Sequence, residues 1–102
     1  MMRSHTCGEL RASHIGQRVT LCGWVDTSRD HGGAVFLDLR DRYGITQVVA
    51  APESGAQCVG EAKKLRNEDV VQVTGVVADR LEGKTNLKLA TGEIEIRAES
   101  IK

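Results

Sequence analysis

Apolar and polar residues alternate with a period of two along most of this chain, a pattern typical of β-strands with one buried face. The clearest alternation covers residues 34–41, where three aliphatic residues share one face. The other face carries Phe36, Asp38 and Arg40. Since the aliphatic face already supplies the core, this pattern predicts that the chain's only phenylalanine is displayed among charges.

The same alternation predicts further strands, separated by polar stretches. The predicted strands are residues 18–25, 34–41, 45–50, 70–78 and 92–98. Residues 26–33 are polar and end in two glycines, so they predict a long loop between the first two strands. Residues 80–91 are also polar and predict a second loop. The first three strands form an antiparallel meander in the simplest interpretation.

A helical spacing of apolar residues interrupts the strands between residues 53 and 68. Its stripe consists of Ala56, Val59, Ala62 and Leu65. Three strands, one helix and two strands is the element order of the OB-fold, a five-stranded Greek-key barrel. The sequence therefore predicts an all-β fold with one helix between strands 3 and 4. A ferredoxin-like fold needs two crossover helices, and the pattern contains one.

Composition limits the chain to one module. Its 102 residues allow a single domain, 1–102, but not a catalytic domain with a cofactor cleft as well. The 14 Lys and Arg balance 14 Asp and Glu, which argues against nucleic-acid binding by bulk charge alone. A local, contact-specific site remains compatible with that balance. The chain has no apolar run near the roughly 18 residues of a membrane span, so we expect a soluble cytoplasmic protein without membrane contacts.

The sequence contains no recognisable motif for a metal site or a catalytic centre. Cys7, Cys22 and Cys58 are far apart and odd in number, which favours small buried thiols over disulfides or zinc ligation. The three histidines have no metal-ligand spacing. Aspartates and arginines interleave in residues 29–42, which favours structural ion pairs over paired catalytic carboxylates. We expect no catalytic residue and no metal in this segment.

The predicted barrel gives the remaining unusual residues a common location. In OB-folds, ligands bind on strands 2 and 3 and on the loops that join strands 1 and 2 and strands 4 and 5. Phe36 falls on strand 2 and can stack on an unpaired base. Gln47 falls on strand 3, where its amide can donate to and accept from a pyrimidine edge. The two predicted loops add Arg29, His31, Arg80 and Asn86.

Each of these residues also has a structural alternative. Phe36 could be covered by a neighbouring loop or helix, and Gln47 could bond to solvent or to a neighbouring strand. The loop arginines could be solvated. On the last strand, a carboxylate such as Glu95 could accept from a guanine edge, although a solvated outer face is the usual explanation.

Motifs spread over nearly the whole chain resemble one family. They are Cys22-Gly23-Trp24-Val25, Arg29-Asp30-His31-Gly32-Gly33, Phe36-Leu37-Asp38-Leu39-Arg40-Asp41, Gln47-Val48-Val49, Leu65-Arg66-Asn67-Glu68 and Ala90-Thr91-Gly92-Glu93-Ile94-Glu95. In this order they resemble the N-terminal anticodon-binding domain of bacterial-type aspartyl-tRNA synthetases. The resemblance implies a parent ligase that uses ATP and magnesium to attach aspartate to tRNA, and that forms a homodimer. It implies that the present segment lacks the catalytic region, needs no cofactor and is a monomer alone.

The resemblance also implies residue roles. Phe36 is expected to stack on the central U of the anticodon, with Gln47 bonded in the same pocket. Four further positions match contacts to anticodon bases or the adjoining backbone: Arg29, Arg80, Asn86 and Glu95. Of these, Glu95 is expected to read the first base, G. One departure is Asp26-Thr27-Ser28, where many relatives carry arginines, which puts some phosphate contacts in doubt.

Two positions bear on which tRNAs the parent enzyme charges. His31 and Gly83 resemble relaxed family members, which charge both the aspartate and the asparagine tRNA. The two anticodons differ in the third base, C or U. A histidine ring donates or accepts according to its tautomer, and glycine removes a long cation. We therefore expect a non-discriminating enzyme.

Two other functions fit the same residues. A free-standing OB module could bind single-stranded DNA or RNA without sequence preference, and its binding would be sensitive to salt. A protein-interaction OB domain could use Phe36 as an anchor, which suits the zero net charge.

Overall fold

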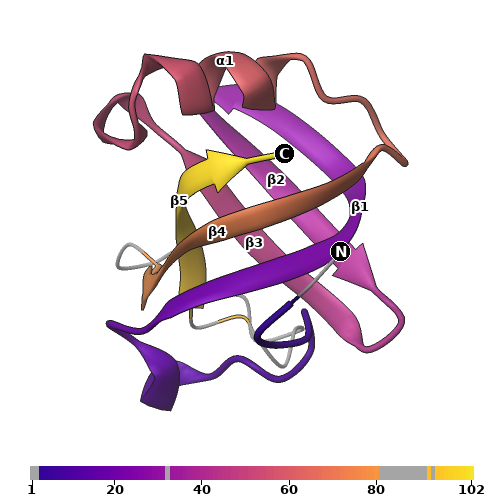
Figure 1. The fold of residues 1–102 in the computed structure, drawn as a ribbon, viewed down its shortest axis with the longest axis vertical. Helices are drawn as coiled ribbons and strands as arrows, with labels where there is room; N and C mark the ends of the chain where they lie inside the picture. Colours follow the sequence, from indigo (N-terminus) through magenta and orange to yellow (C-terminus); the bar gives the residue numbers. More distant parts are fainter. Residues whose placement is uncertain (1–2, 32, 81–91, 93) are drawn as a thin grey trace.

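The computed structural model describes residues 3–31, 33–80, 92 and 94–102. In this part of the chain, five strands close into a barrel in the order β1-β2-β3-β5-β4, with one α-helix across an end (Figure 1). The elements are η1 (Ala12–His14), β1 (Arg18–His31), β2 (Ala34–Asp41), β3 (Gly44–Ala50), η2 (Pro52–Ser54), α1 (Ala56–Lys63), β4 (Val70–Asp79) and β5 (Ile94–Ile101). The predicted five-stranded barrel with a helix between strands 3 and 4 is confirmed.

Closure depends on β5, which lies between β3 and β4. It pairs with β4 in antiparallel fashion and with β3 in parallel. Gly75 of β4 lies against β5, and a Cβ at this position would lie 2.4 Å from the backbone oxygen of Arg97. Only glycine permits so close an approach of the two strands. The parallel pairing with β3 sets outward-facing residues of β5 beside those of β3.

Aliphatic side chains fill the barrel, as the alternation predicts. On β2 the inward residues Val35, Leu37 and Leu39 are buried, while the residues between them are half-buried. Cys7 and Cys58 are also buried, and burial raises the pKa of both thiols. The core therefore uses β-branched and leucine side chains with almost no aromatic contribution.

One cysteine and one aspartate differ from expectation. Cys22 is half-buried, because it belongs to the outward set of β1 and not to the core. Asp41 forms none of the expected ion pairs among the described contacts; its carboxylate accepts from the backbone N–H of Cys7, Tyr43 and Gly44. These bonds join the N-terminal segment to the turn between β2 and β3.

The prediction of a long loop over residues 26–33 is wrong. β1 continues to His31, and after a shift of register between Val25 and Thr27 it pairs with the first half of β2. Thr27 to Asp30 are all exposed, so this part of the strand has no apolar face to produce an alternating pattern. Backbone pairing with β2 forms the strand regardless, and Arg29 lies on a strand instead of in a loop.

The helix is shorter than the predicted 53–68. Pro52 opens a 3-10 turn, and Gly55 separates that turn from α1 with a φ of +96°, which favours glycine. Helical structure ends at Lys63, yet Leu65 still packs against the core. The apolar stripe therefore predicted the packing of Leu65 beyond the end of the helix, whereas Ala56, at the start of the stripe, is exposed. No helix in the described residues is long and apolar enough to cross a membrane.

Candidate nucleic-acid interface

Strand register places Phe36 in a row of outward-facing residues that crosses four strands. Phe36 pairs with Arg29 of β1 on one side and with Val49 of β3 on the other. Val49 in turn pairs with Arg97 of β5. Because directly paired residues point to the same side of a sheet, these four side chains share one face. Phe36 is therefore flanked by Arg29 and Val49, with Arg97 at the far end of the row.

A second row runs parallel to the first and is wholly polar. Asp38 of β2 pairs with Thr27 of β1 and with Gln47 of β3. Glu95 of β5 continues the row, since Nε2 of Gln47 donates to Oε1 of Glu95 at 3.1 Å. The period of two puts this row next to the row of Phe36 on the same face.

Hydrogen bonds and ion pairs link the two rows into one network. Arg29 bridges Asp38 and Gln47, with Nη1 at 3.3 Å from Oδ2 of the aspartate and Nη2 donating to Oε1 of the glutamine at 3.4 Å. At the other end, Nε of Arg97 lies 3.8 Å from Oε2 of Glu95. The face thus carries both donors and acceptors in fixed positions.

A hollow of about 230 Å³ opens beside the ring of Phe36. Its lining residues are Ala34, Phe36, Val49, Ala51, Ser54, Glu95 and Arg97. Most of this lining is apolar, with one carboxylate and one guanidinium. An aromatic surface next to groups that bond base edges and phosphates is the arrangement that single-stranded nucleic-acid sites use.

The electrostatics of the face depend on burial. Glu95 is only 7% exposed, so the expected solvated outer face is wrong at this position. Burial raises the pKa of Glu95, while the Gln47 hydrogen bond and the positive charges of Arg97 and Arg80 oppose that rise. Burial likewise lowers the pKa of Arg80, opposed by the charges of Asp38 and Glu95. An ionised carboxylate is therefore held here at a cost in free energy of folding.

That cost predicts a pH-dependent effect of Glu95→Gln on stability. A carboxyl whose pKa is raised in the folded state stabilises the fold fully below its unfolded pKa, about 4.3, and this contribution is lost as pH rises through the folded value. The neutral variant has no such loss. We expect the difference in Tm between Glu95→Gln and the unsubstituted chain to increase in favour of the variant between pH 4 and pH 8.

Thermal melts across that range test the expectation. Glu99→Gln is the matched control, because Glu99 lies on the same strand with an exposed side chain. A Tm difference that shrinks as pH rises would show that Glu95 is not stabilised in its protonated form.

The structure brings together five of the residues predicted from the sequence. They are Arg29, Phe36, Gln47, Arg80 and Glu95. Arg80 follows β4, and its Nε donates to the backbone oxygen of Ile94 at 3.1 Å. His31 is the last residue of β1, and its side chain is not described. Asn86 and Gly83 lie outside the described residues.

Two members of the network were not among the predicted site residues. Asp38 was expected in a structural ion pair, and its pairing with Arg29 confirms that expectation. Arg97 is on the same face of the last strand as Glu95, and its side chain is 55% exposed. Each lies two positions from a predicted site residue on the same strand, Asp38 from Phe36 and Arg97 from Glu95, and therefore points to the same face. Period-two alternation was the signal that could have found them.

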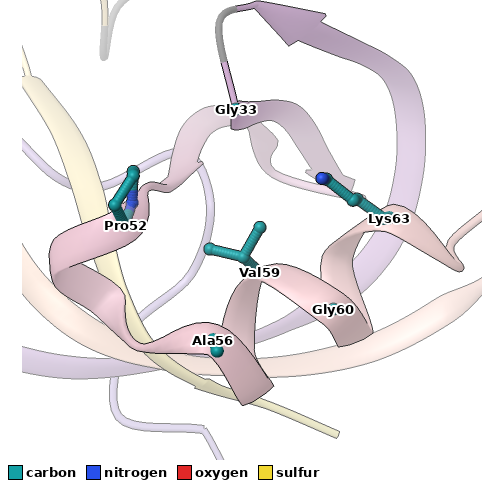
Figure 2. Close-up of a pocket in the computed structure, with 6 residues that line it drawn as sticks. All are labelled: Gly33, Pro52, Ala56, Val59, Gly60 and Lys63. Carbon is teal, nitrogen blue, oxygen red and sulfur yellow. The ribbon is translucent and has the colours of Figure 1, made fainter.

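A second hollow, of about 370 Å³, lies between α1 and the start of β2 (Figure 2). Its lining is Gly33, Pro52, Ala56, Val59, Gly60 and Lys63. None of the predicted site residues whose side chains the structure describes lines it. Within the described residues, no group of three His, Cys, Asp or Glu side chains could hold a metal ion.

The closed five-stranded barrel, with its polar and aromatic face on β2 and β3, defines a protein of the OB-fold class. The chain belongs to the family of OB-fold nucleic acid binding domains designated tRNA_anti-codon, whose sequence model matches residues 19–102.

Individual relatives are consistent with this family. The chain is 64% identical over 100 residues to the aspartate–tRNA(Asp/Asn) ligase of Rhodopirellula baltica, a match to 97% of this chain and 17% of that protein. It is 56% identical over 100 residues to the aspartate–tRNA(Asp/Asn) ligase of Rubrobacter xylanophilus, covering 98% of this chain and 16% of that protein. The chain therefore spans only a small part of the curated relatives it matches.

Among solved structures, the chain is similar to asparaginyl-tRNA synthetase from Pyrococcus horikoshii in complex with asparaginyl-adenylate. The TM-score is 0.82 at 32% sequence identity, and the match covers 100% of this chain and 22% of that chain.

Proposed function

We propose that this domain recognises the anticodon loop of a tRNA. The observation that carries the proposal is the position of Phe36 on one face with Arg29, Gln47 and Glu95. Phe36 stacks the central base, Gln47 bonds the edge of that base, and Glu95 accepts from the first base. Stacking and edge contacts of this kind are the usual means of reading unpaired RNA.

The parent protein in this proposal is an aspartate–tRNA ligase. The support is the name shared by the relatives, together with the small share of their length that the chain covers. This domain is then the N-terminal recognition module, and the ligase activity, with its ATP and magnesium, belongs to the remainder of the enzyme. We propose further that the enzyme is a cytoplasmic homodimer and that the isolated domain is a monomer.

The same proposal includes relaxed tRNA choice. The relatives' names specify both tRNA(Asp) and tRNA(Asn), and these tRNAs differ in the third anticodon base. His31, at the end of β1, and Gly83 are assigned to tolerance of that base, and Arg80 and Asn86 to contacts with the loop. Discrimination is thus separated from the central base, which the two tRNAs share.

Titration of the domain with RNA stem-loops tests the proposal. Loops that carry GUC or GUU in the anticodon position are expected to bind with similar affinity, and both more tightly than a loop of scrambled sequence. Each titration is repeated at two salt concentrations, because phosphate contacts weaken as salt increases whereas base contacts do not.

Three outcomes separate the functions. Preference for the GUC and GUU loops supports anticodon recognition. Equal, salt-sensitive binding to every oligonucleotide contradicts it and favours a general single-strand binder. Absence of binding to any RNA contradicts both and favours a protein-interaction domain.

A further inference from the structure

We propose that Arg29 and Glu95 hold the side-chain amide of Gln47 in one orientation, and that this orientation selects uracil over cytosine for the base stacked on Phe36. The inference rests on the proposed function, since it assumes that a uracil occupies the site. It assigns a positioning role to the two charged residues, in addition to any contact they make with RNA.

The orientation of the amide follows from the chemistry of its neighbours. A guanidinium can only donate hydrogen bonds, and an ionised carboxylate can only accept them. Oε1 of Gln47 lies 3.4 Å from Nη2 of Arg29, and Nε2 lies 3.1 Å from Oε1 of Glu95. A reversed amide would set N–H groups against the guanidinium and an oxygen against the carboxylate. Both bonds would be lost, so one orientation is strongly preferred.

Each of the two neighbours is itself held in place. Asp38 pairs with Arg29, and Arg97 pairs with Glu95. The chain of contacts therefore crosses β1, β2, β3 and β5, and its two ends are ion pairs. Gln47 is 8% exposed and Glu95 7%, so water has little access to replace a lost bond. The amide is fixed before any ligand arrives.

A fixed amide distinguishes the two pyrimidines because their edges have opposite polarity. Ring position 3 is an N–H donor in uracil and an acceptor in cytosine, whereas position 4 carries an oxygen in uracil and an amino group in cytosine. An amide whose oxygen faces position 3 and whose N–H faces position 4 bonds uracil at both places. Cytosine seated in the same register meets two repulsive contacts. A freely rotating glutamine would turn over and accept either base.

The amide of Gln47 has enough hydrogen-bonding groups to contact a base as well as its two protein neighbours. An amide NH2 has two hydrogens and an amide oxygen has two lone pairs. Among the described residues, Gln47 bonds through its amide to Glu95 and Arg29, which uses one of each and leaves one of each for a base. The two neighbours thus orient the reading group without consuming it.

The test is the ratio of dissociation constants for two stem-loops, one with GCC and one with GUC in the anticodon position. We expect the unsubstituted domain to prefer GUC by roughly 5- to 150-fold. Arg29→Gln replaces a group that can only donate hydrogen bonds, and Glu95→Gln replaces one that can only accept them. In both variants the new amide can donate or accept. We expect each variant to lower the ratio, and the double variant to bring it close to one.

Controls separate positioning from damage. Arg18→Gln and Glu99→Gln are matched substitutions in an exposed pair on the same two strands, and should leave the ratio unchanged. General damage to the fold weakens both loops equally and leaves the ratio intact, so a lowered ratio reports a change at the central base itself. Gln47→Leu removes the reading group and should also abolish the preference.

Failure of the inference is distinguishable from failure of the proposed function. If GUC binds no better than a scrambled loop, anticodon recognition itself is wrong. Suppose that GUC is preferred over both the scrambled and the GCC loops, and that the double variant keeps the same ratio of dissociation constants between GCC and GUC. The function then stands, and the orienting role of Arg29 and Glu95 is wrong.

Discussion

Phe36→Ala is expected to weaken binding of the GUC stem-loop by about 1–3 kcal/mol, which corresponds to roughly a 5- to 150-fold rise in Kd. The ring is half-buried; it lies between Arg29 and Val49 on the candidate face and beside the 230 Å³ hollow. Its removal takes away the stacking surface and leaves the polar network in place. Isothermal titration or fluorescence anisotropy with a labelled stem-loop measures the change.

Tyr43→Ala is the matched control for that variant. Tyr43 is the chain's other single-ring aromatic, 55% exposed in the turn between β2 and β3, and it contacts Arg3 instead of the candidate face. We expect this substitution to leave RNA affinity unchanged. If Phe36→Ala has no larger effect than Tyr43→Ala, Phe36 does not contact the RNA.

The charge balance of the chain has a local counterpart at this face. Arg29 is paired with Asp38, and Arg97 with Glu95. Each described cation of the two rows therefore has a carboxylate beside it, and the face has little net charge to attract phosphates. Binding should depend on base contacts and show a shallow dependence on salt. Zero net charge is thus compatible with a specific RNA site.

Much of the fold could be predicted because the strands that enclose the core have one apolar face. Alternation correctly assigned Leu37 to the core and Phe36 to the opposite face of the same strand. The OB-fold element order then placed Phe36 and Gln47 on neighbouring strands. It failed for residues 26–31, where β1 extends with polar residues on both faces. Pairing with β2, a long-range interaction, makes that segment a strand, and no local pattern reports it.

The sequence predicted several of the residues that share the candidate face, but not the contacts that join them. Glu95 and Gln47 are 48 positions apart, and their hydrogen bond exists because β5 runs parallel to β3. Parallel pairing between strands distant in sequence leaves no signature in either segment alone. For the same reason the burial of Glu95, and the shift in its pKa, could be found only in the assembled barrel.

The residue next to Phe36 should give the opposite phenotype, and this contrast is the strongest test of the period-two assignment. Leu37 is fully buried in the barrel, so Leu37→Ala is expected to lower the free energy of unfolding by about 2–5 kcal/mol through lost apolar contacts and the cavity left behind. Urea denaturation measures the loss. Leu37→Met nearly conserves volume and should cost less than about 1.5 kcal/mol.

Binding separates the two positions further. Leu37 points into the core, away from the row of Phe36, so the folded fraction of Leu37→Ala should bind the GUC stem-loop with nearly unchanged affinity. Phe36→Ala should instead lose affinity and keep most of its stability. If Leu37→Ala proved no less stable than Leu37→Met, or if folded Leu37→Ala lost as much affinity as Phe36→Ala, the assignment of the two faces of β2 would be wrong. Because buried and outward residues alternate along β2, consecutive residues of one strand can serve the core and the proposed RNA-binding face.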